Sequence, residues 1–297
     1  MQYQTPAALE SAIRDVARHS EMDTGRAITL LWWDRFLSRV FTSECPEFVL
    51  KGGLSMLARV CSRYTKDIDL AAEEADINAA EKKLVTLASF DLGDFFQFSL
   101  KDSESIKPDA EYRTGRRLIF DVVIGSQRRG TIKVDLVVGC MPIGELERVA
   151  PANRLNVKGL PAADYYLYPI ADTVADKVCA TIATYPEDRQ SSRVKDLIDL
   201  VVIANKISLA ADILCKAIAS EMRQRKLRGI VAFCIPDSWR TNTISASYRK
   251  LAQEANLSAF YYDIESAEEL VKRLVDPLIG NDEVAGRWDP DLLAWVT

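Results

Sequence analysis

The sequence predicts an α/β (α+β) protein, in which a mixed β-sheet with helices is followed by a mainly helical C-terminal domain. Up to about residue 150, short β-branched and aromatic segments alternate with segments of helical period. From residue 171 onward almost every segment has apolar residues at helical spacing. We therefore expect two domains, residues 1–155 and 156–297, that meet in a loop rich in Pro, Ala and Asn.

Strands and helices should alternate in the first domain. Two helices are expected at its start, over residues 7–19 and 24–40, with Thr5 and Asp23 as N-cap residues. Later helices are expected at 54–60 and 76–89. The strands should lie at 48–50, at the end of 63–72, and at 95–101, 116–125 and 131–139, the last two joined by a tight turn at SQRRG.

Helical patterns dominate the second domain. The segments with helical period are 171–184, 191–205, 208–226, 243–255 and 265–275. Nothing in the composition indicates disorder or a membrane protein, since 48% of the 297 residues are hydrophobic and 27% are charged. The polar N-terminus has no apolar signal core, and the longest apolar runs are too short to span a bilayer, so we expect a cytoplasmic protein.

Cysteine and histidine usage narrows the possible chemistry. The six cysteines are scattered and form no CxxC pair, which favours reduced core thiols over a zinc site or a disulfide framework. His19 is the single histidine, so a mechanism that needs two histidines is excluded. Chemistry must come from carboxylates, lysine, arginine or a bound metal ion.

The net charge of −5 does not attract nucleic acid by its overall field. Binding to RNA would therefore need a local basic patch, although each basic cluster could equally be a solvated face. The candidate clusters are Arg113, Arg116 and Arg117; Arg128, Arg129 and Lys133; and Arg223, Arg225, Lys226 and Arg228.

One short segment carries the clearest chemical pattern. A strand ends in Gly52-Gly53, a helix begins at once, and Asp67-Ile68-Asp69 follows on a second strand. Paired glycines let the backbone approach a phosphate, and the helix start behind them offers free N–H groups to an anion. Residues i and i+2 of a strand share a face, so Asp67 and Asp69 should point to one place, where Mg²⁺ would relieve their repulsion.

A third carboxylate would complete a two-metal site. Asp135 lies in the middle of the apolar strand IKVDLVV and is the candidate. It could instead lie on an exposed face, but Lys133 and Asp135 together favour a wet active-site face. A GG pair or a DxD alone is weak evidence, whereas this spacing with a third acidic strand residue is strong evidence.

These blocks, in this order, resemble a known family. The pattern resembles the DNA polymerase β-like nucleotidyltransferase superfamily. KGGLSML, RYTKDIDL, IKVDLVV, YPIADTVADKVCATI and SSRVKDLIDLVVIA together resemble the AbiEii/AbiGii toxins, including the MenT toxins. The resemblance covers roughly residues 45–205, and it implies a polymerase β-like nucleotidyltransferase sheet in the first domain.

The resemblance implies a set of site residues. Asp67, Asp69 and Asp135 would hold metal, and Asp67 and Asp69 would also be catalytic, together with Lys177 and Asp196. Lys177, on an otherwise apolar helix face, would hold the nucleotide's phosphates; alternatively, its stem only snorkels to water. Asp199 is a less favoured alternative to Asp196; otherwise we expect it to be only a helix-packing partner of Lys195 or Arg193. The expected nucleotide-binding residues are Lys51, Gly52, Gly53, Ser55, Thr65, Lys177 and Arg193.

The resemblance also implies a function. It points to a Mg²⁺-dependent toxin of a type IV-like toxin–antitoxin system that transfers NMP from an NTP, with a pyrimidine base, to the 3′ end of tRNA. The expected partners are an NTP, tRNA or another RNA acceptor, and a cognate antitoxin, with no membrane. Two alternatives remain open: transfer to a protein or small molecule, and a nucleotide-binding interaction protein without turnover.

Overall fold

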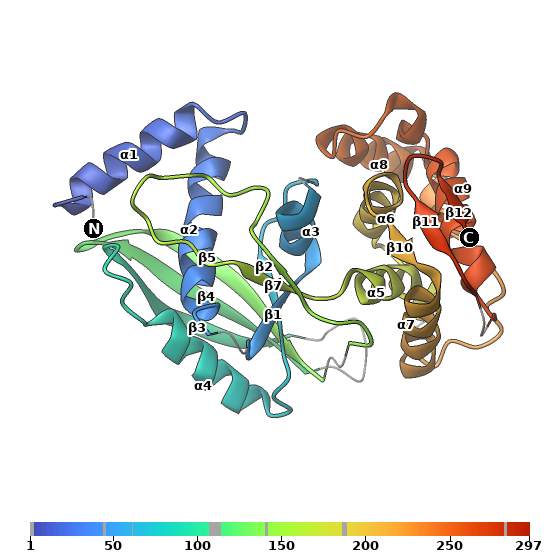
Figure 1. Cartoon of the computed structure of the whole chain (residues 1–297), viewed down its shortest axis with the longest axis horizontal. Coiled ribbons are helices and arrows are strands. Elements are labelled where there is room, and N and C mark those ends of the chain that lie inside the picture. The colour runs from blue at the N-terminus through green and yellow to red at the C-terminus, as the bar shows by residue number, and fades with distance from the viewer. Residues whose placement is uncertain are drawn as a thin grey trace.

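A seven-stranded mixed sheet forms the first half of the chain (Figure 1). The computed structural model describes residues 3–43, 46–60, 62–106, 114–139, 142–185, 189–281 and 284–297. The strand order is β3-β4-β5-β2-β1-β7-β6. The strands are β1 (Phe48–Lys51), β2 (Ile68–Ala72), β3 (Phe96–Ile106), β4 (Thr114–Ile124), β5 (Gln127–Val138), β6 (Glu147–Val149) and β7 (Tyr165–Leu167).

Parallel and antiparallel pairs alternate in the middle of this sheet. Strand β2 runs parallel to β5 and antiparallel to β1, and β1 runs parallel to β7. The predicted mixed sheet is therefore confirmed. The predicted SQRRG turn is too long, because β5 already begins at Gln127 and the turn consists of Gly125 and Ser126, with φ +63° at Gly125.

Two helices cover one face of the sheet. They are α2 (Thr24–Val40) and α4 (Ile77–Ala88), and α1 (Pro6–Arg18) packs against α2. Phe36 of α2 packs its ring against Phe98 and Phe120 of the sheet. The predicted caps are confirmed, since Thr5 and Asp23 each accept a backbone N–H from the first turn that follows. The opposite face is left for the polar residues of β2 and β5.

Helices make up most of the second half. They are α5 (Ile170–Ile182), α6 (Val194–Lys206), α7 (Ala211–Gln224), α8 (Asn242–Glu254) and α9 (Ile264–Val275). The sequence patterns missed two small sheets here, because strands of two or three residues have no readable period. These are the pair β8 (Thr184–Tyr185) and β9 (Arg189–Gln190), and the three strands β10 (Leu209–Ala210), β11 (Arg287–Asp289) and β12 (Ala294–Val296).

Buried apolar side chains form two large clusters. One contains the sheet with α1, α2 and α4, and the other contains α5 to α9. Helix α3 (Gly52–Val60) touches both, since Leu54 belongs to the first cluster and Met56 to the second. The boundary at 155/156 stays a prediction; Val157 and Tyr165, which follow it, lie in the first cluster. In the described residues no helix is long and apolar enough to cross a membrane.

Candidate active site

A row of charged residues crosses the face of the sheet opposite the one that Ile68 and Leu70 line. Asp69 of β2 is the register partner of Lys51 on β1 and of Asp135 on β5. Asp135 is in turn the partner of Arg117 on β4. Register partners in neighbouring strands point to the same face, so these four side chains share one surface. The alternation is the expected one, because Ile68 and Leu70 on either side of Asp69 are fully buried.

The two glycines make room for this row. Gly52 has φ +62°, and a Cβ there would lie 1.9 Å from Oδ2 of Asp69. A Cβ on Gly53 would lie 2.8 Å from the side chain of Thr65. Thr65 is buried, and its hydroxyl donates to Oδ1 of Asp67 at 3.2 Å. Any larger residue at either glycine would therefore displace a carboxylate or the threonine that orients one.

Lys51 and Ser55 are held closely by their surroundings. The Lys51 ammonium lies 4.0 Å from the centre of the Tyr168 ring, and the side chain is largely buried. Ser55 is fully buried in α3, and its hydroxyl donates to the Gly52 carbonyl at 2.9 Å. Ser55 thus fixes the turn that carries the glycines, whereas Lys51 places a cation beside Asp69.

Burial and the neighbouring carboxylates disfavour the charged form of Asp69. Burial, followed by the charges of Asp67 and Asp135, raises the pKa of Asp69 to about 7, although Lys177 and Lys51 oppose the rise. Burial and two neighbouring carboxylates thus disfavour the ionised form of Asp69, and a bound cation would favour it. Mg²⁺ prefers carboxylate oxygens, so the donor set of Asp67, Asp69 and Asp135 fits this ion chemically. Among the described residues, however, no group of three or more His, Cys, Asp or Glu is already arranged around a metal position.

Arg117 holds both oxygens of the third carboxylate. Its Nε donates to Oδ1 of Asp135 and its NH2 to Oδ2, both at 2.7 Å. This bidentate pair covers both oxygens of the third carboxylate. Arg117 had been predicted only as part of a basic RNA-binding cluster, and the structure places it in the charged row instead.

Asp69→Asn should stabilise the metal-free protein at neutral and higher pH. A carboxyl whose pKa is raised on folding binds its proton more tightly in the folded state, so the wild type loses stability as pH rises from about 4 to about 7. The neutral amide removes that loss. We expect a higher unfolding midpoint at pH 8, by roughly 2–4 °C for each kcal/mol recovered. The gain should shrink at pH 4–5; an equal gain at both pH values would contradict the electrostatic cause.

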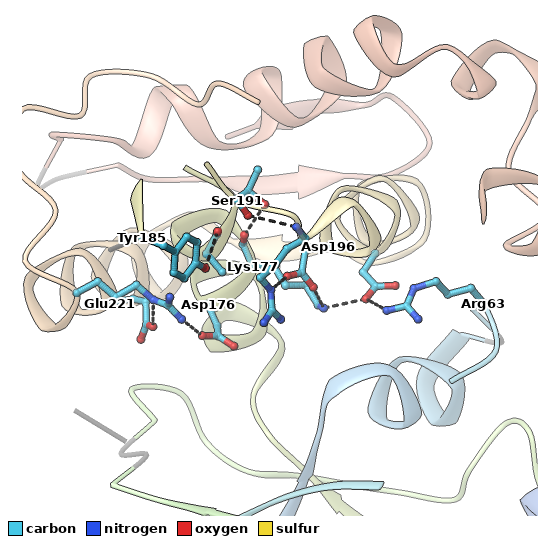
Figure 2. A network of polar contacts seen from close by, with 12 residues as sticks. Arg63, Asp176, Lys177, Tyr185, Ser191, Asp196 and Glu221 are labelled. Atoms are coloured by element: carbon cyan, nitrogen blue, oxygen red, sulfur yellow. Dashed lines mark hydrogen bonds and ion pairs between the residues drawn. The ribbon is translucent and has the colours of Figure 1, made fainter. Parts of the chain in front are cut away.

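A second, buried network surrounds Lys177 (Figure 2). Its ammonium donates to Oδ1 of Asp196 and to Oδ2 of Asp199, both at 2.8 Å. Arg193 donates to the other oxygen of Asp196, and Arg63 donates to Oδ2 of Asp199 at 2.9 Å. Three cations and two carboxylates give this network one excess positive charge. Burial lowers the pKa of Lys177, but the charges of Asp196 and Asp199 raise it by more. The net pKa is therefore above the usual value, and the side chain stays charged.

Arg63 is the residue of this network that sequence reasoning missed. It lies four positions before Asp67 and reaches α6 from the segment that follows α3 (Figure 2). The expected partners of Asp199, Lys195 or Arg193, are wrong: Asp199 pairs with Arg63 and Lys177. Oδ1 of Asp199 and Nε of Arg63 are buried without a hydrogen-bond partner in the described part of the chain. This network therefore joins the DxD segment to α5 and α6.

Lys177 and the aspartate row are electrostatically linked. The charge of Lys177 lowers the pKa of Asp69, although 108 positions separate the two residues in the sequence. The direct partners of the ammonium are nevertheless Asp196 and Asp199, not the DxD carboxylates. The structure thus brings Lys177, Asp196 and Arg193 together in one network, beside the row that contains Lys51, Asp69 and Asp135.

Most arginines of the predicted basic clusters are paired with acids. Arg116 contacts Glu81, Arg128 contacts Asp121, and Arg129 contacts Glu10. Arg225 is nearly buried between Glu221 and Asp176. Arg113 lies outside the described residues. Lys133 is exposed on the same face of β5 as Asp135, two residues from the charged row.

A solved nucleotidyltransferase toxin shares this fold. MenT4, a nucleotidyltransferase toxin from Mycobacterium tuberculosis H37Rv, matches with a TM-score of 0.52 and 15% identity over 95% of this chain and 100% of its own. An H. pylori protein provisionally assigned as a nucleotidyltransferase matches at 0.41 and 12%, over 87% of this chain and 98% of its own. A search of curated proteins found no match. The family model described as nucleotidyl transferase AbiEii toxin, type IV toxin–antitoxin system, matches residues 35–283, so the chain belongs to the AbiEii family of nucleotidyltransferase toxins.

Proposed function

We propose that this nucleotidyltransferase transfers NMP from an NTP, with a pyrimidine base, to the 3′ end of tRNA and so blocks translation. The observation that carries the proposal is the charged row, in which Asp69 and Asp135 lie side by side as register partners with Asp67 two residues away. Nucleotidyl transfer needs acceptor-only carboxylates at a common point and a cation near the phosphates. The proposal of a tRNA acceptor is supported by this chain's membership of a family of nucleotidyltransferase toxins.

Each group has a task in this proposal. Asp67, Asp69 and Asp135 would hold Mg²⁺, which when bound neutralises the triphosphate and lowers the pKa of the attacking 3′-hydroxyl. Lys177, whose network has one excess positive charge, would bind the phosphates of the NTP. Asp196 and Arg193 would keep the lysine ammonium in place through the contacts they already make. The exposed Lys133 would contact the RNA backbone on the same face.

The proposal is tested by labelling. Purified protein is incubated with total tRNA, Mg²⁺ and each α-labelled NTP in turn, and the products are separated on a denaturing gel. We expect label on full-length tRNA with CTP or UTP, and none after periodate oxidation of the tRNA 3′ end. Label on protein alone, or on a small molecule from a cell extract, would instead identify a different acceptor.

A binding module without turnover is the remaining alternative. Such a protein would bind an NTP but release no pyrophosphate with any acceptor. The proposal further places the enzyme in the cytoplasm, where NTPs and tRNA are found, together with a cognate antitoxin. Co-expression with the neighbouring gene product should then restore growth if the enzyme alone inhibits it.

A further inference from the structure

Asp135 is paired with Arg117 in the structure, and it is also one of the proposed metal ligands. We propose that Arg117 is an exchange residue of the active site: it holds Asp135 while no metal is bound, and turns to the triphosphate when metal takes the carboxylate. The inference rests on the proposed function, because it needs a metal–nucleotide substrate.

The contact geometry supports the first half of the exchange. Both guanidinium donors lie 2.7 Å from the two oxygens of Asp135, so the fork covers the edge of the carboxylate that a metal would approach. The guanidinium remains charged at every accessible pH, since Asp135 raises the pKa of Arg117 further. A metal ion that takes this edge of Asp135 must therefore displace a charged Arg117, because the arginine does not lose its proton.

The surroundings of Arg117 support the second half. Its side chain is 35% exposed, whereas that of Asp135 is only 15% exposed, so the arginine can leave without opening the core. On its other side in the sheet, Arg117 has Glu104 of β3 as register partner. From β3 to β1, the five strands thus place an acid, a base, two acids and a base in one row. Arg117 supplies the positive charge on β4. Released from Asp135, its donors match phosphate oxygens as well as they match a carboxylate.

This exchange predicts different behaviour toward free metal and toward metal with nucleotide. Free metal that takes this edge of Asp135 breaks the bidentate pair and brings no anion for Arg117 in exchange. A metal–nucleotide complex brings the cation that displaces Arg117 and the anion that receives it. Arg117 therefore disfavours a site that holds metal without nucleotide, and favours a site that holds metal and nucleotide together.

The test is titration of the purified full chain with Mn²⁺ alone, followed by calorimetry or by the EPR signal of free Mn²⁺. Arg117→Gln should bind Mn²⁺ roughly tenfold more tightly than the wild type, since one charge-assisted pair no longer competes. Arg116→Gln is the matched control: Arg116 is the adjacent residue on β4, pairs with Glu81, and should leave Mn²⁺ affinity unchanged. In an Asp135→Asn background, Arg117→Gln should give no gain.

Several outcomes would overturn the exchange. Wild-type protein that binds Mn²⁺ with the same or higher affinity than Arg117→Gln shows that Arg117 does not compete, while the metal site itself stands. No Mn²⁺ binding by any variant removes the metal site and the exchange together. If Arg117→Gln does not fold, Arg117→Lys serves instead, because a lysine cannot make the fork and should give a smaller gain in the same direction.

Discussion

Alanine at Asp67 or at Asp69 should abolish nucleotidyl transfer and, with it, any growth inhibition on expression. Transfer concentrates negative charge on the α-phosphate and on the leaving pyrophosphate, and the chain has a single histidine with which to manage that charge. Metal neutralisation is therefore the main catalytic device available. Losing one preorganised charge stabiliser commonly costs about 10²–10³ in rate, and loss of a metal ligand should cost at least this much.

The control for this prediction is another aspartate of the same sheet. Asp121→Ala removes an acid that pairs with Arg128 near the β4–β5 turn, away from the charged row, and should leave the transfer rate near normal. The rate is measured as labelled product per enzyme at saturating NTP, with a thermal unfolding curve for each variant. A double Asp67→Ala/Asp69→Ala variant that keeps near-normal, Mg²⁺-dependent transfer would disprove the proposed mechanism as a whole.

The aspartate row was predictable from sequence because its signals are local. A strand, two glycines, a helix and a DxD follow one another within 22 residues, from Val49 to Leu70. Period-two alternation then fixed which side chains share a face, as the full burial of Ile68 and Leu70 bears out. Asp135 was recognised as an acid in an apolar strand, although its register opposite Asp69 is set by pairing between residues that are 66 positions apart.

The partners of the charged residues were not predictable in the same way. Arg63 and Asp199 are 136 positions apart, and nothing in either local segment indicates the other. Arg117 looked like one residue of a basic run, since an arginine pattern does not distinguish a phosphate contact from an ion pair. Local periodicity identifies faces and elements, whereas ion pairs across the fold depend on how distant elements pack. This is why Lys177 was found but its buried partners were only partly found.

Lys177→Met should abolish transfer, while Arg63→Met should leave most of it. Both changes remove one positive charge from the same buried network, so both leave two cations with Asp196 and Asp199. Without Lys177, Arg193 still pairs with Asp196 and Arg63 with Asp199; without Arg63, Lys177 still contacts both carboxylates. Charged hydrogen bonds contribute about 1.5–3 kcal/mol each, so both variants should unfold at lower temperature yet remain folded.

The comparison between the two variants separates a phosphate contact from a structural ion pair. If Lys177 binds the triphosphate, its loss removes a cation that contacts the phosphates directly, and the rate should fall about 10²-fold or more. Arg63 acts on the lysine indirectly through Asp199, so Arg63→Met should raise the KM for NTP more than it lowers kcat, and Arg63→Lys should restore part of the loss. Suppose instead that the two methionine variants lose activity only as far as each loses thermal stability. The whole network would then be structural, and the phosphates would be bound elsewhere.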